Sequence, residues 1–297
     1  MKERERQTRS AKVKQAFSQA AQEYDGGAGL QRVVAEELLE GITSLGNDPS
    51  TFDTILDIGC GTGFLTIGLK KRFPGAAVAG CDIAHPMVIV TSSRVEGDTS
   101  MLVTSDGAAL PFKASRFNLV ASNLTYQWFP ELSDAFSEAY RVLTPGGVFA
   151  FTLLGEGTFK ELKSSYMDAS RAAKRNGLPP LMDFPSSLQV NNALESAGFH
   201  HTAITFPPKR RFYEDLFSLL KCVRRIGAAN PSPEGDRSLG RGSLLREMAR
   251  LYRERFSAVI HTRQEESHTT TKVEVGATAE EHIYATYNVL FCTARKK

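Results

Sequence analysis

The chain has 297 residues, of which 41% are hydrophobic and 23% are charged, and its net charge is only +3. No apolar run approaches the roughly 20 residues that a membrane helix needs, and the first residues carry mixed charges, so we expect no membrane span, secretory leader or transit peptide. The four cysteines are widely separated and form no C-x-x-C pair. This pattern predicts no disulfide framework, no metal site and a reducing, cytoplasmic compartment.

Two amphipathic segments open the chain. Apolar residues recur at helical spacing from Lys12 to Tyr24 and again from Leu30 to Leu39, and Asp-Gly-Gly at residues 25–27 separates the two patterns as a hinge. We interpret residues 1–47 as lid helices that lie outside the sheet and enclose a ligand. A packed N-terminal helix without ligand contact fits the periodicity equally well.

The glycine-rich stretch that follows has the character of a cofactor loop. A short apolar strand runs directly into Gly59, Gly61 and Gly63, and residues 64–72 read as the helix that such a loop normally precedes. The spacing is G-x-G-x-G and lacks one residue of the dinucleotide fingerprint. Asp57, just before the loop, would repel phosphate and accept hydrogen bonds from an ammonium group. These features favour an amino-acid-like cofactor over a dinucleotide.

Acidic residues end the next two apolar runs. A second buried strand ends at Asp82, where a parallel sheet would offer a carboxylate to two ribose hydroxyls. A third run ends at Asp106, followed by Gly107 and Ala108, which suits a side chain and a backbone amide that address the edge of an adenine. Single acids after strands are also common helix N-caps, so each signal alone is weak.

The remaining elements continue the alternation of strands and helices. Residues 117–123 predict a fourth strand, residues 141–147 end a helix in a Pro-Gly-Gly turn, and residues 148–154 predict a fifth strand. Alternation over 282–294 predicts a final strand. The polar, Thr/Glu-rich stretch 263–281 before it predicts a mobile loop. This order predicts an α/β fold.

The glycine loop, followed in register by the two strand-end acids and the Pro-Gly-Gly turn, resembles the motifs of the class I S-adenosylmethionine-dependent methyltransferases. The resemblance implies a Rossmann-like fold: a seven-stranded, mainly parallel sheet with an antiparallel last strand and helices on both faces. It implies an S-adenosylmethionine-binding core over 48–212, a helical substrate-cap insertion over 213–257, and completion of the core by 258–297. The implied cofactor-binding residues are Gln31, Asp57, Gly59, Gly61, Gly63, Asp82, Ile83, Met87, Asp106, Gly107, Ala108 and Asn123.

A closer resemblance covers nearly the whole chain. Five segments are similar to the malonyl-[acyl-carrier protein] O-methyltransferases of biotin synthesis, namely residues 16–25, 30–31, 122–129, 151–157 and 220–228. The Ser-Asn-Leu-x-x-Gln-Trp block and the late Ile-Gly-Ala are more specific than the glycine loop, whereas 263–281 departs from the shorter relatives. The resemblance implies methylation of the free carboxylate of a malonyl thioester, carried by acyl-carrier protein or coenzyme A. It implies neither a nucleic-acid nor a membrane partner.

This reaction requires few catalytic side chains. A malonyl carboxylate is already ionised at neutral pH, so attack on a sulfonium methyl group needs no general base. Because an anion and a cation lose charge together, a dry pocket that aligns the reacting atoms should supply most of the acceleration. We expect Trp128 and Phe129 to form its walls and Tyr24 to close it. The single Trp is equally the kind of residue that packs in a core.

A basic segment follows the core. Residues 205–256 hold twelve Lys/Arg against six Asp/Glu, a net charge of +6. Lys221 and Arg224 lie three apart in an apolar helical pattern and would share a face, so we predict that they orient the substrate carboxylate or thioester arm, with Arg225 as a further candidate. The wider surface would suit the acidic face of a carrier protein. Alternatively, these residues simply solvate helix faces.

Two other functions fit parts of the sequence. A superfamily member could methylate another small molecule such as a quinone precursor, although carbon methylation would usually need a base that the sequence does not identify. A non-methylating assembly factor, similar to those of mitochondrial respiratory complex I, would share the cofactor core. Nucleic-acid methylation is disfavoured because Ser122-Asn-Leu stands where an Asn-Pro-Pro-Tyr motif would follow the fourth strand.

Overall fold

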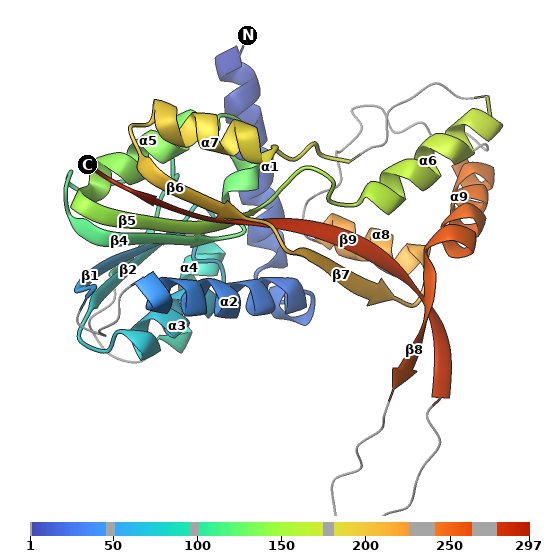
Figure 1. Ribbon diagram of the computed structural model, residues 1–297, viewed down its shortest axis with the longest axis horizontal. Coiled ribbons are helices and arrows are strands. Elements are labelled where there is room, and N and C mark those ends of the chain that lie inside the picture. The colour runs from blue at the N-terminus through green and yellow to red at the C-terminus, as the bar shows by residue number, and fades with distance from the viewer. Residues whose placement is uncertain (1, 46–50, 96–100, 175–180, 226–240, 263–277) are drawn as a thin grey trace, which may run out of the picture. The chain divides into compact units, whose positions relative to one another are not determined.

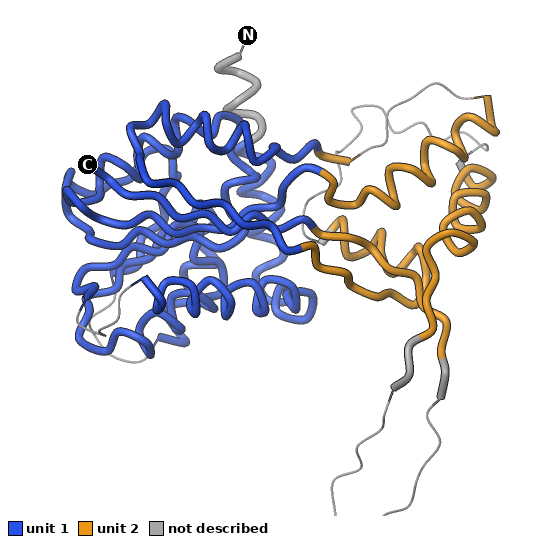
Figure 2. The backbone as a smooth tube through the Cα atoms, viewed as in Figure 1, with its two compact units in different colours: residues 1–156, 183–207, 288–297 blue, residues 157–182, 208–287 orange. Residues whose placement is uncertain are grey.

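The computed structural model describes the chain outside residues 1, 46–50, 96–100, 175–180, 226–240 and 263–277. The chain divides into two compact units, which we describe separately (Figure 2). The first holds residues 1–156, 183–207 and 288–297, and the second holds residues 157–182 and 208–287. No helix within the described residues combines the length and the apolar character needed to cross a membrane.

The first unit is built on a mainly parallel sheet (Figure 1). In the described residues, seven strands follow the order β3-β2-β1-β4-β5-β9-β6. Neighbouring strands from β3 to β5 pair in parallel, and β9 runs antiparallel to both β5 and β6. The prediction of a seven-stranded, mainly parallel sheet with an antiparallel last strand is therefore confirmed. The strands are β1 Thr54–Ile58, β2 Ala77–Asp82, β3 Met101–Thr104, β4 Phe117–Asn123, β5 Leu143–Leu154, β6 His200–Thr205 and β9 Thr278–Arg295.

The strand order creates a crevice at one end of the sheet. The chain moves outward from β1 through β2 to β3 and then returns to place β4 on the other side of β1. Connections therefore leave the carboxyl ends of β1 and β4 in opposite directions, and α/β sheets bind ligands at such a switch point. Ile55, Leu56, Leu119 and Val120 in these two strands are fully buried because helices cover both faces of the sheet.

Helices cover the two faces of this sheet. Residues of α2 and α3 share one buried cluster with β1, β2 and β5, whereas residues of α5 and α7 belong to the cluster on the opposite face. The apolar stripe of α2, Leu30, Val34, Leu38 and Ile42, recurs every four residues and is buried. The helical elements are α1 Lys2–Ala20, η1 Tyr24–Gly26, α2 Gly29–Leu45, α3 Phe64–Arg72, α4 His85–Arg94, η2 Tyr126–Trp128, α5 Leu132–Val142 and α7 Ser187–Ser196.

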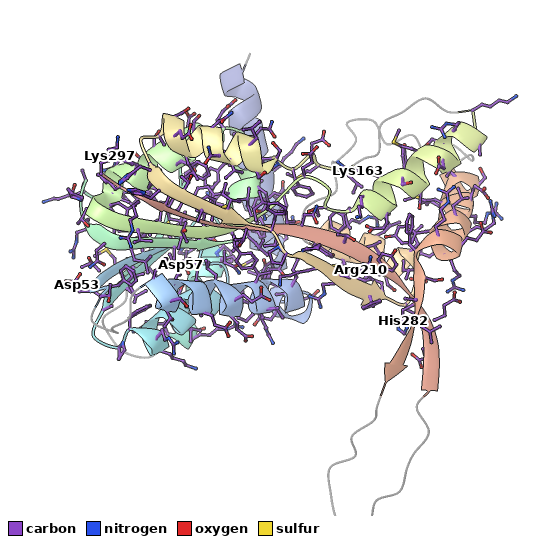
Figure 3. All side chains as sticks on the ribbon, in the orientation of Figure 1. Asp53, Asp57, Lys163, Arg210, His282 and Lys297 are labelled. Atoms are coloured by element: carbon purple, nitrogen blue, oxygen red, sulfur yellow. The ribbon has the colours of Figure 1, made fainter. Side chains whose placement is uncertain are left out.

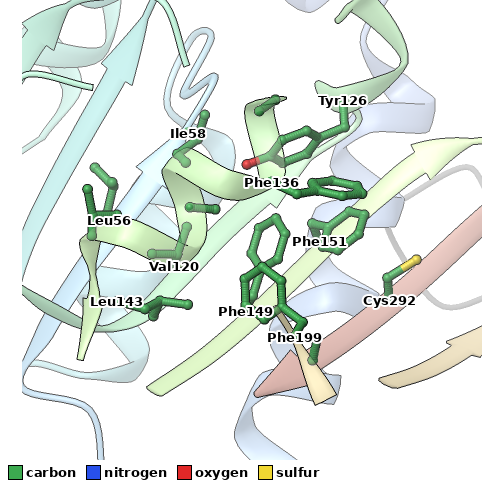
Figure 4. Close-up of a cluster of buried hydrophobic side chains, with 14 of the residues drawn as sticks. Leu56, Ile58, Val120, Tyr126, Phe136, Leu143, Phe149, Phe151, Phe199 and Cys292 are labelled. Atoms are coloured by element: carbon green, nitrogen blue, oxygen red, sulfur yellow. The ribbon is translucent and has the colours of Figure 1, made fainter. Parts of the chain in front are cut away.

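An aromatic cluster forms the core beneath η2 (Figure 4). The ring of Tyr126 is fully buried and lies 5.0 to 5.4 Å from the rings of Phe136, Phe149 and Phe151. Phe149 and Phe151 point to the same side of β5 and stack at 4.3 Å. This packing anchors η2, and with it Trp128, to the rigid part of the sheet.

The second unit combines helices with a short antiparallel sheet. Helix α6 packs along α9, and Arg255 of α9 pairs with Asp168 of α6 at 2.5 Å. The first part of β9 pairs with β7 and β8. The guanidinium of Arg210, which is labelled in Figure 3, lies 4.6 Å from the ring centre of Tyr284. The elements are α6 Lys160–Ala172, β7 Pro208–Tyr213, α8 Leu216–Arg225, α9 Arg241–Phe256, β8 Ser257–Thr262 and the part of β9 before residue 288.

The two units and the predicted segments do not coincide. The second unit includes residues 208–212, predicted as part of the core, and residues 258–287, predicted to complete the core. Helix α6 groups with the second unit, outside the predicted cap 213–257, because it packs against α9. The N-terminal helices, predicted as the separate segment 1–47, group with the first unit. Most of the predicted mobile loop 263–281 lies outside the described residues, and its last residues begin β9.

Candidate functional site

A pocket lies in the first unit at the carboxyl ends of β1, β2 and β4. It contains about 740 Å³ of space free of protein atoms, part of it open to solvent. Three groups of residues form its wall: the strand ends, the N-terminal segment, and the turn that carries η2. They are Ile58, Gly59, Gly61, Cys81, Asp82, Ile83, Met87, Ser105, Asp106 and Gly107; Ser10, Val13, Phe17 and Tyr24; and Asn123, Leu124, Thr125, Trp128, Phe129 and Pro130.

The glycine loop shapes one side of this pocket. Gly59 and Gly61 have φ angles of 74° and 54°, a left-handed conformation that glycine adopts without strain. A Cβ atom on Gly59 would lie 2.3 Å from Oγ1 of Thr125, so only glycine permits this approach of the β1 and β4 ends. Gly63, with φ of 95°, is the N-cap of α3 and does not line the pocket.

Two backbone amides fix the carboxylate of Asp82 at the pocket wall. The amide of Gly61 donates to Oδ2 at 3.0 Å, and the amide of Ala84 donates to Oδ1 at 2.8 Å. Burial raises the pKa of this carboxyl, and the backbone hydrogen bonds oppose the rise. Asp82 and its neighbour Ile83 both line the pocket, and the Asp82 carboxylate is an immobilised acceptor at the strand end where the sequence predicted a ribose-binding acid.

Asp57 is a buried carboxylate with one oxygen unused. Thr66 Oγ1 donates to Oδ2 at 2.6 Å, whereas Oδ1 has no hydrogen-bond partner among the described residues. Burial raises the pKa of Asp57 to about 7, although the Thr66 bond lowers it. Asp57 does not itself line the pocket, but the next residues, Ile58 and Gly59, do. An unpaired buried acceptor is costly and fits a site completed by a ligand that donates hydrogen bonds.

The turn after β3 places a third acid at the pocket. Asp106 Oδ1 accepts a hydrogen bond from the amide of Ala108 at 2.9 Å, and Asp106 and Gly107 line the pocket while Ala108 does not. A Cβ atom on Gly107 would lie 2.7 Å from Cζ of Phe129 and 2.9 Å from Cγ2 of Ile58. Gly107 therefore allows this turn to pack closely against the pocket wall.

Aromatic side chains from the N-terminal segment and η2 meet at the pocket. The ring of Phe17 lies edge-on to Trp128, with 5.6 Å between ring centres, and tilted to Tyr24 at 6.1 Å, and all three residues line the pocket. Burial raises the pKa of the Tyr24 hydroxyl, and the charge of Asp82 raises it further. Phe17 was not among the predicted site residues. Its helical spacing with Val13 was visible in the sequence, but the same spacing marks an ordinary core stripe.

Asn123 and Met87 link the pocket wall to neighbouring helices. Asn123 Nδ2 donates to the carbonyl of Gln31 at 2.9 Å, which ties α2 to the end of β4. Gln31 does not line the pocket, and its Oε1 is a second buried acceptor without a hydrogen-bond partner in the described part of the chain. Met87 is buried on α4 and packs with Ala21 and the partly buried Phe17 and Tyr24.

The predicted cationic residues belong to the second unit. Lys221 and Arg224 are both exposed on α8, and their spacing of three places them on one side of the helix. The structure thus brings Tyr24 and Trp128 together with Gly59, Gly61, Asp82, Ile83, Met87, Asp106, Gly107 and Asn123 around one pocket. The binding roles of these residues, and of Lys221 and Arg224, remain predictions.

Comparison with known proteins adds independent evidence. Residues 56–151, from within β1 to within β5, match the family described as "Methyltransferase domain". The chain is 38% identical to a malonyl-[acyl-carrier protein] O-methyltransferase of Geobacter sulfurreducens, over 82% of this chain and 91% of the relative. It is 35% identical to a protein of the same name from Methylococcus capsulatus, over 80% of this chain and 83% of that one.

Solved structures support the fold. A SAM-dependent methyltransferase of Thermotoga maritima superposes with a TM-score of 0.51 at 14% identity, covering 95% of this chain and 99% of that one. Phosphoethanolamine N-methyltransferase 2 of Haemonchus contortus, solved with S-adenosyl-L-methionine, gives a TM-score of 0.50 at 19% identity, covering 88% of this chain and 53% of that one. At these identities the likeness concerns the fold, which is that of the class I methyltransferases.

Proposed function

The chain belongs to the family of malonyl-[acyl-carrier protein] O-methyltransferases, and on that premise we propose that it methylates the free carboxylate of a malonyl thioester held on acyl-carrier protein, an early step of biotin synthesis. The enzyme is an S-adenosylmethionine-dependent O-methyltransferase. When bound, S-adenosylmethionine supplies an electrophilic methyl group on a sulfonium centre.

The observation that carries the proposed site concerns two carboxylates. Asp82 is fixed by backbone amides, and Asp57 has an oxygen without a hydrogen-bond partner among the described residues. Asp82, held by two backbone amides, would accept hydrogen bonds from the ribose hydroxyls. The free Oδ1 of Asp57 and Oε1 of Gln31 would receive donors from the amino-acid end of the cofactor. Asp106 and the adjacent Gly107-Ala108 backbone would address the adenine.

The aromatic wall would do most of the catalytic work. Phe17, Tyr24 and Trp128 surround the same pocket and would exclude water from the reacting centre. A carboxylate acceptor is ionised at neutral pH and needs no base, so orientation and a dry environment would suffice. The pKa of the Tyr24 hydroxyl, which is ordinarily already well above neutral pH, is raised further by burial, so the hydroxyl stays protonated and can donate a hydrogen bond to an anion.

The exposed cations of the second unit would recruit the substrate. Lys221 and Arg224 lie within a segment of net charge +6, whereas Arg250 and Arg255 are already paired with Glu247, Glu254 and Asp168. Such a surface would steer the acidic carrier protein toward the enzyme. Raising the salt concentration should then slow turnover of carrier-bound malonate more than that of malonyl-coenzyme A. Equal slowing of both substrates would refute this role.

The setting of the reaction completes the proposal. All four cysteines are unpaired, and three of them are buried. Unpaired thiols of this kind suit the reducing cytoplasm, where we place the enzyme.

One assay tests the proposal directly. The purified protein is incubated with methyl-labelled S-adenosylmethionine and with malonyl-, succinyl- and acetyl-carrier protein, and the products are examined by mass spectrometry. We expect a base-labile methyl ester on malonate alone. Binding of the cofactor without transfer to malonate would contradict the proposed substrate.

A further inference from the structure

Asp25 joins the N-terminal segment to the glycine loop. Thr62 Oγ1 donates a hydrogen bond to Asp25 Oδ1 at 2.8 Å, and Arg94 Nη1 lies 2.7 Å from Asp25 Oδ2. Thr62 stands in the loop between two of its glycines, and Arg94 is the last residue of α4. None of these three residues lines the pocket, so Asp25 would act on a ligand only through its neighbours.

These contacts form a closed network around the loop. Arg94 Nη1 also donates to the carbonyl of Thr62 at 3.0 Å, and Thr91 Oγ1 donates to the carbonyl of Gly61 at 2.7 Å. Arg32 also lies near Asp25, with 3.8 Å between its Nη2 and Asp25 Oδ2, and its guanidinium lies 4.7 Å from the ring centre of Phe64. The glycine loop is therefore held through the Thr62 hydroxyl and through the carbonyl groups of Gly61 and Thr62.

The segment that Asp25 holds forms one wall of the pocket. We call residues 10–26, from α1 and η1, the N-terminal arm. Its Val13, Phe17 and Tyr24 line the pocket, and Phe17 contacts Trp128 across it. Tyr24 directly precedes Asp25 in the chain, so a shift of the Asp25 backbone also displaces the Tyr24 side chain. The side chains of Asp25 and Arg94 are 25% and 37% exposed, so solvent screens this pair less than a fully exposed one.

We propose that Asp25 is a positioning residue that latches the N-terminal arm to the glycine loop and so couples closure of the arm to retention of the cofactor. The inference rests on the proposed assignment of this pocket to S-adenosylmethionine. The ion pair to Arg94 and the hydrogen bond from Thr62 hold Tyr24 and Phe17 against the pocket, and the same bonds hold the loop in its left-handed conformation. Loss of the latch should speed release of the cofactor more than it slows the chemical step.

The test uses the single tryptophan of the chain, Trp128, as a reporter inside the pocket. Fluorescence during titration and stopped-flow displacement gives the dissociation constant and release rate of S-adenosylhomocysteine. Asp25→Asn keeps an acceptor for Thr62 and removes the charge. We expect its dissociation constant and release rate to rise about tenfold, equivalent to about 1.4 kcal/mol. KM for S-adenosylmethionine should rise similarly, with kcat within about twofold of wild type.

Further variants separate a latch from a general loss of stability. Arg94→Met should match Asp25→Asn, Arg94→Lys should retain most of the affinity, and the double variant should be no weaker than either single one because the pair acts as a unit. Arg72→Met is a matched control, since Arg72 Nε donates to Thr43 between α3 and α2 and neither residue lines the pocket. It should leave cofactor binding unchanged.

The outcomes distinguish the latch from the site itself. Independent, multiplicative effects of Asp25→Asn and Arg94→Met would refute the latch. The latch is also refuted, and the cofactor site retained, if neither variant changes cofactor release while Asp82→Asn does. If Asp82→Asn leaves binding unchanged, the proposed site fails first. Should Asp25→Asn not fold, Thr62→Val, which removes only the hydroxyl, should still raise the release rate by about threefold. An unchanged rate in that variant would also refute the latch.

Discussion

Each unit of the molecule buries a carboxylate, and the two carboxylates differ in their hydrogen bonding. In the first unit, Asp57 receives one hydrogen bond from Thr66 and keeps a second oxygen without a hydrogen-bond partner among the described residues. In the second unit, both oxygens of the buried Glu161 accept hydrogen bonds from Thr286, one from its backbone amide at 3.0 Å and one from its hydroxyl. One carboxylate is left incomplete beside a pocket, and the other is completed by the fold.

Tyrosine hydroxyls of the second unit also find partners within it, whereas the hydroxyls of Ser165 and Ser170 on α6 are buried without a hydrogen-bond partner among the described residues. The hydroxyls of Tyr213 and Tyr287 bond to each other at 2.5 Å, and the hydroxyl of Tyr252 donates to the carbonyl of Tyr284. A polar group satisfied within its own unit stabilises that unit, whereas an unsatisfied one lowers stability until a ligand arrives. Of the two buried carboxylates, only Asp57 keeps an oxygen for a ligand, which supports the proposed cofactor site in the first unit, and we expect the second unit to act through its exposed charge.

The largest effect should follow from removing the fixed carboxylate. Asp82→Asn replaces one acceptor oxygen by a donor group that opposes the amide of either Gly61 or Ala84. Loss of the ribose contact and disorder of the loop together should weaken cofactor binding by about 100-fold or more, from about 3 kcal/mol of charged hydrogen bonding. Calorimetric titration with S-adenosylhomocysteine measures it. A change of less than about threefold would remove Asp82 from the site.

The two buried carboxylates should respond in opposite ways to neutralisation. The pKa of Asp57 is raised from 3.8 to about 7 in the folded protein, so the folded state binds the proton more tightly than the unfolded state. Without ligand, stability is therefore lost as pH rises from about 4 to about 7, by on the order of 3 kcal/mol. Asp57→Asn should recover much of this lost free energy of unfolding at pH 8. It should also weaken cofactor binding by about 30-fold, because the cofactor loses a hydrogen bond to a charged group.

Glu161→Gln is the matched variant in the second unit. Its oxygen can keep the bond from the Thr286 amide and its nitrogen can donate to the Thr286 hydroxyl, but both bonds lose their charge, so the variant should lower the free energy of unfolding by about 1 kcal/mol. Cofactor affinity should be unaffected. Denaturant unfolding of both variants, with and without S-adenosylhomocysteine, compares them directly. Stabilisation by Glu161→Gln, or destabilisation by Asp57→Asn at pH 8, would break the contrast.

The same pKa predicts a pH dependence of binding. A cationic amino group should bind the ionised form of Asp57, and with a pKa of about 7 only about one-tenth of the free protein is ionised at pH 6, against about three-quarters at pH 7.5. The dissociation constant of S-adenosylhomocysteine should therefore be about eightfold higher at pH 6 than at pH 7.5. Asp57→Asn should abolish this dependence, and a flat wild-type profile would count against the role of Asp57.

The first unit was the more predictable from sequence because its signals are local. Glycine spacing and acids at strand ends lie within a few residues of one another, and they placed Gly59, Gly61, Asp82 and Asp106 at the pocket. Gly63 carried the same signal but serves as the N-cap of α3. Spacing alone does not distinguish a glycine that faces a ligand from one that starts a helix.

Long-range contacts were not predictable in the same way. Asp25 was read as part of a hinge and of the segment 16–25 that resembles the family, but its contacts were not predicted, because its partners Thr62 and Arg94 are distant in the chain and no pattern links them. The grouping of α6 with the second unit likewise depends on packing against α9, far along the sequence. Composition located the basic segment, but the ion pairs that occupy Arg250 and Arg255 required the structure.

The smallest effect concerns those charges and tests the other half of the comparison. Lys221→Gln with Arg224→Gln should lower kcat/KM for the proposed carrier-bound substrate about fivefold at low salt and change that for the coenzyme A substrate by less than about twofold. Arg246→Gln with Arg250→Gln removes the same net charge, but Arg250 is already paired with Glu247 and Glu254, so this control should change either rate less. Equal effects of the two pairs would mean that only the total charge of the second unit matters. A selective effect of the α8 pair would mean that Lys221 and Arg224 form a specific docking surface for the carrier protein.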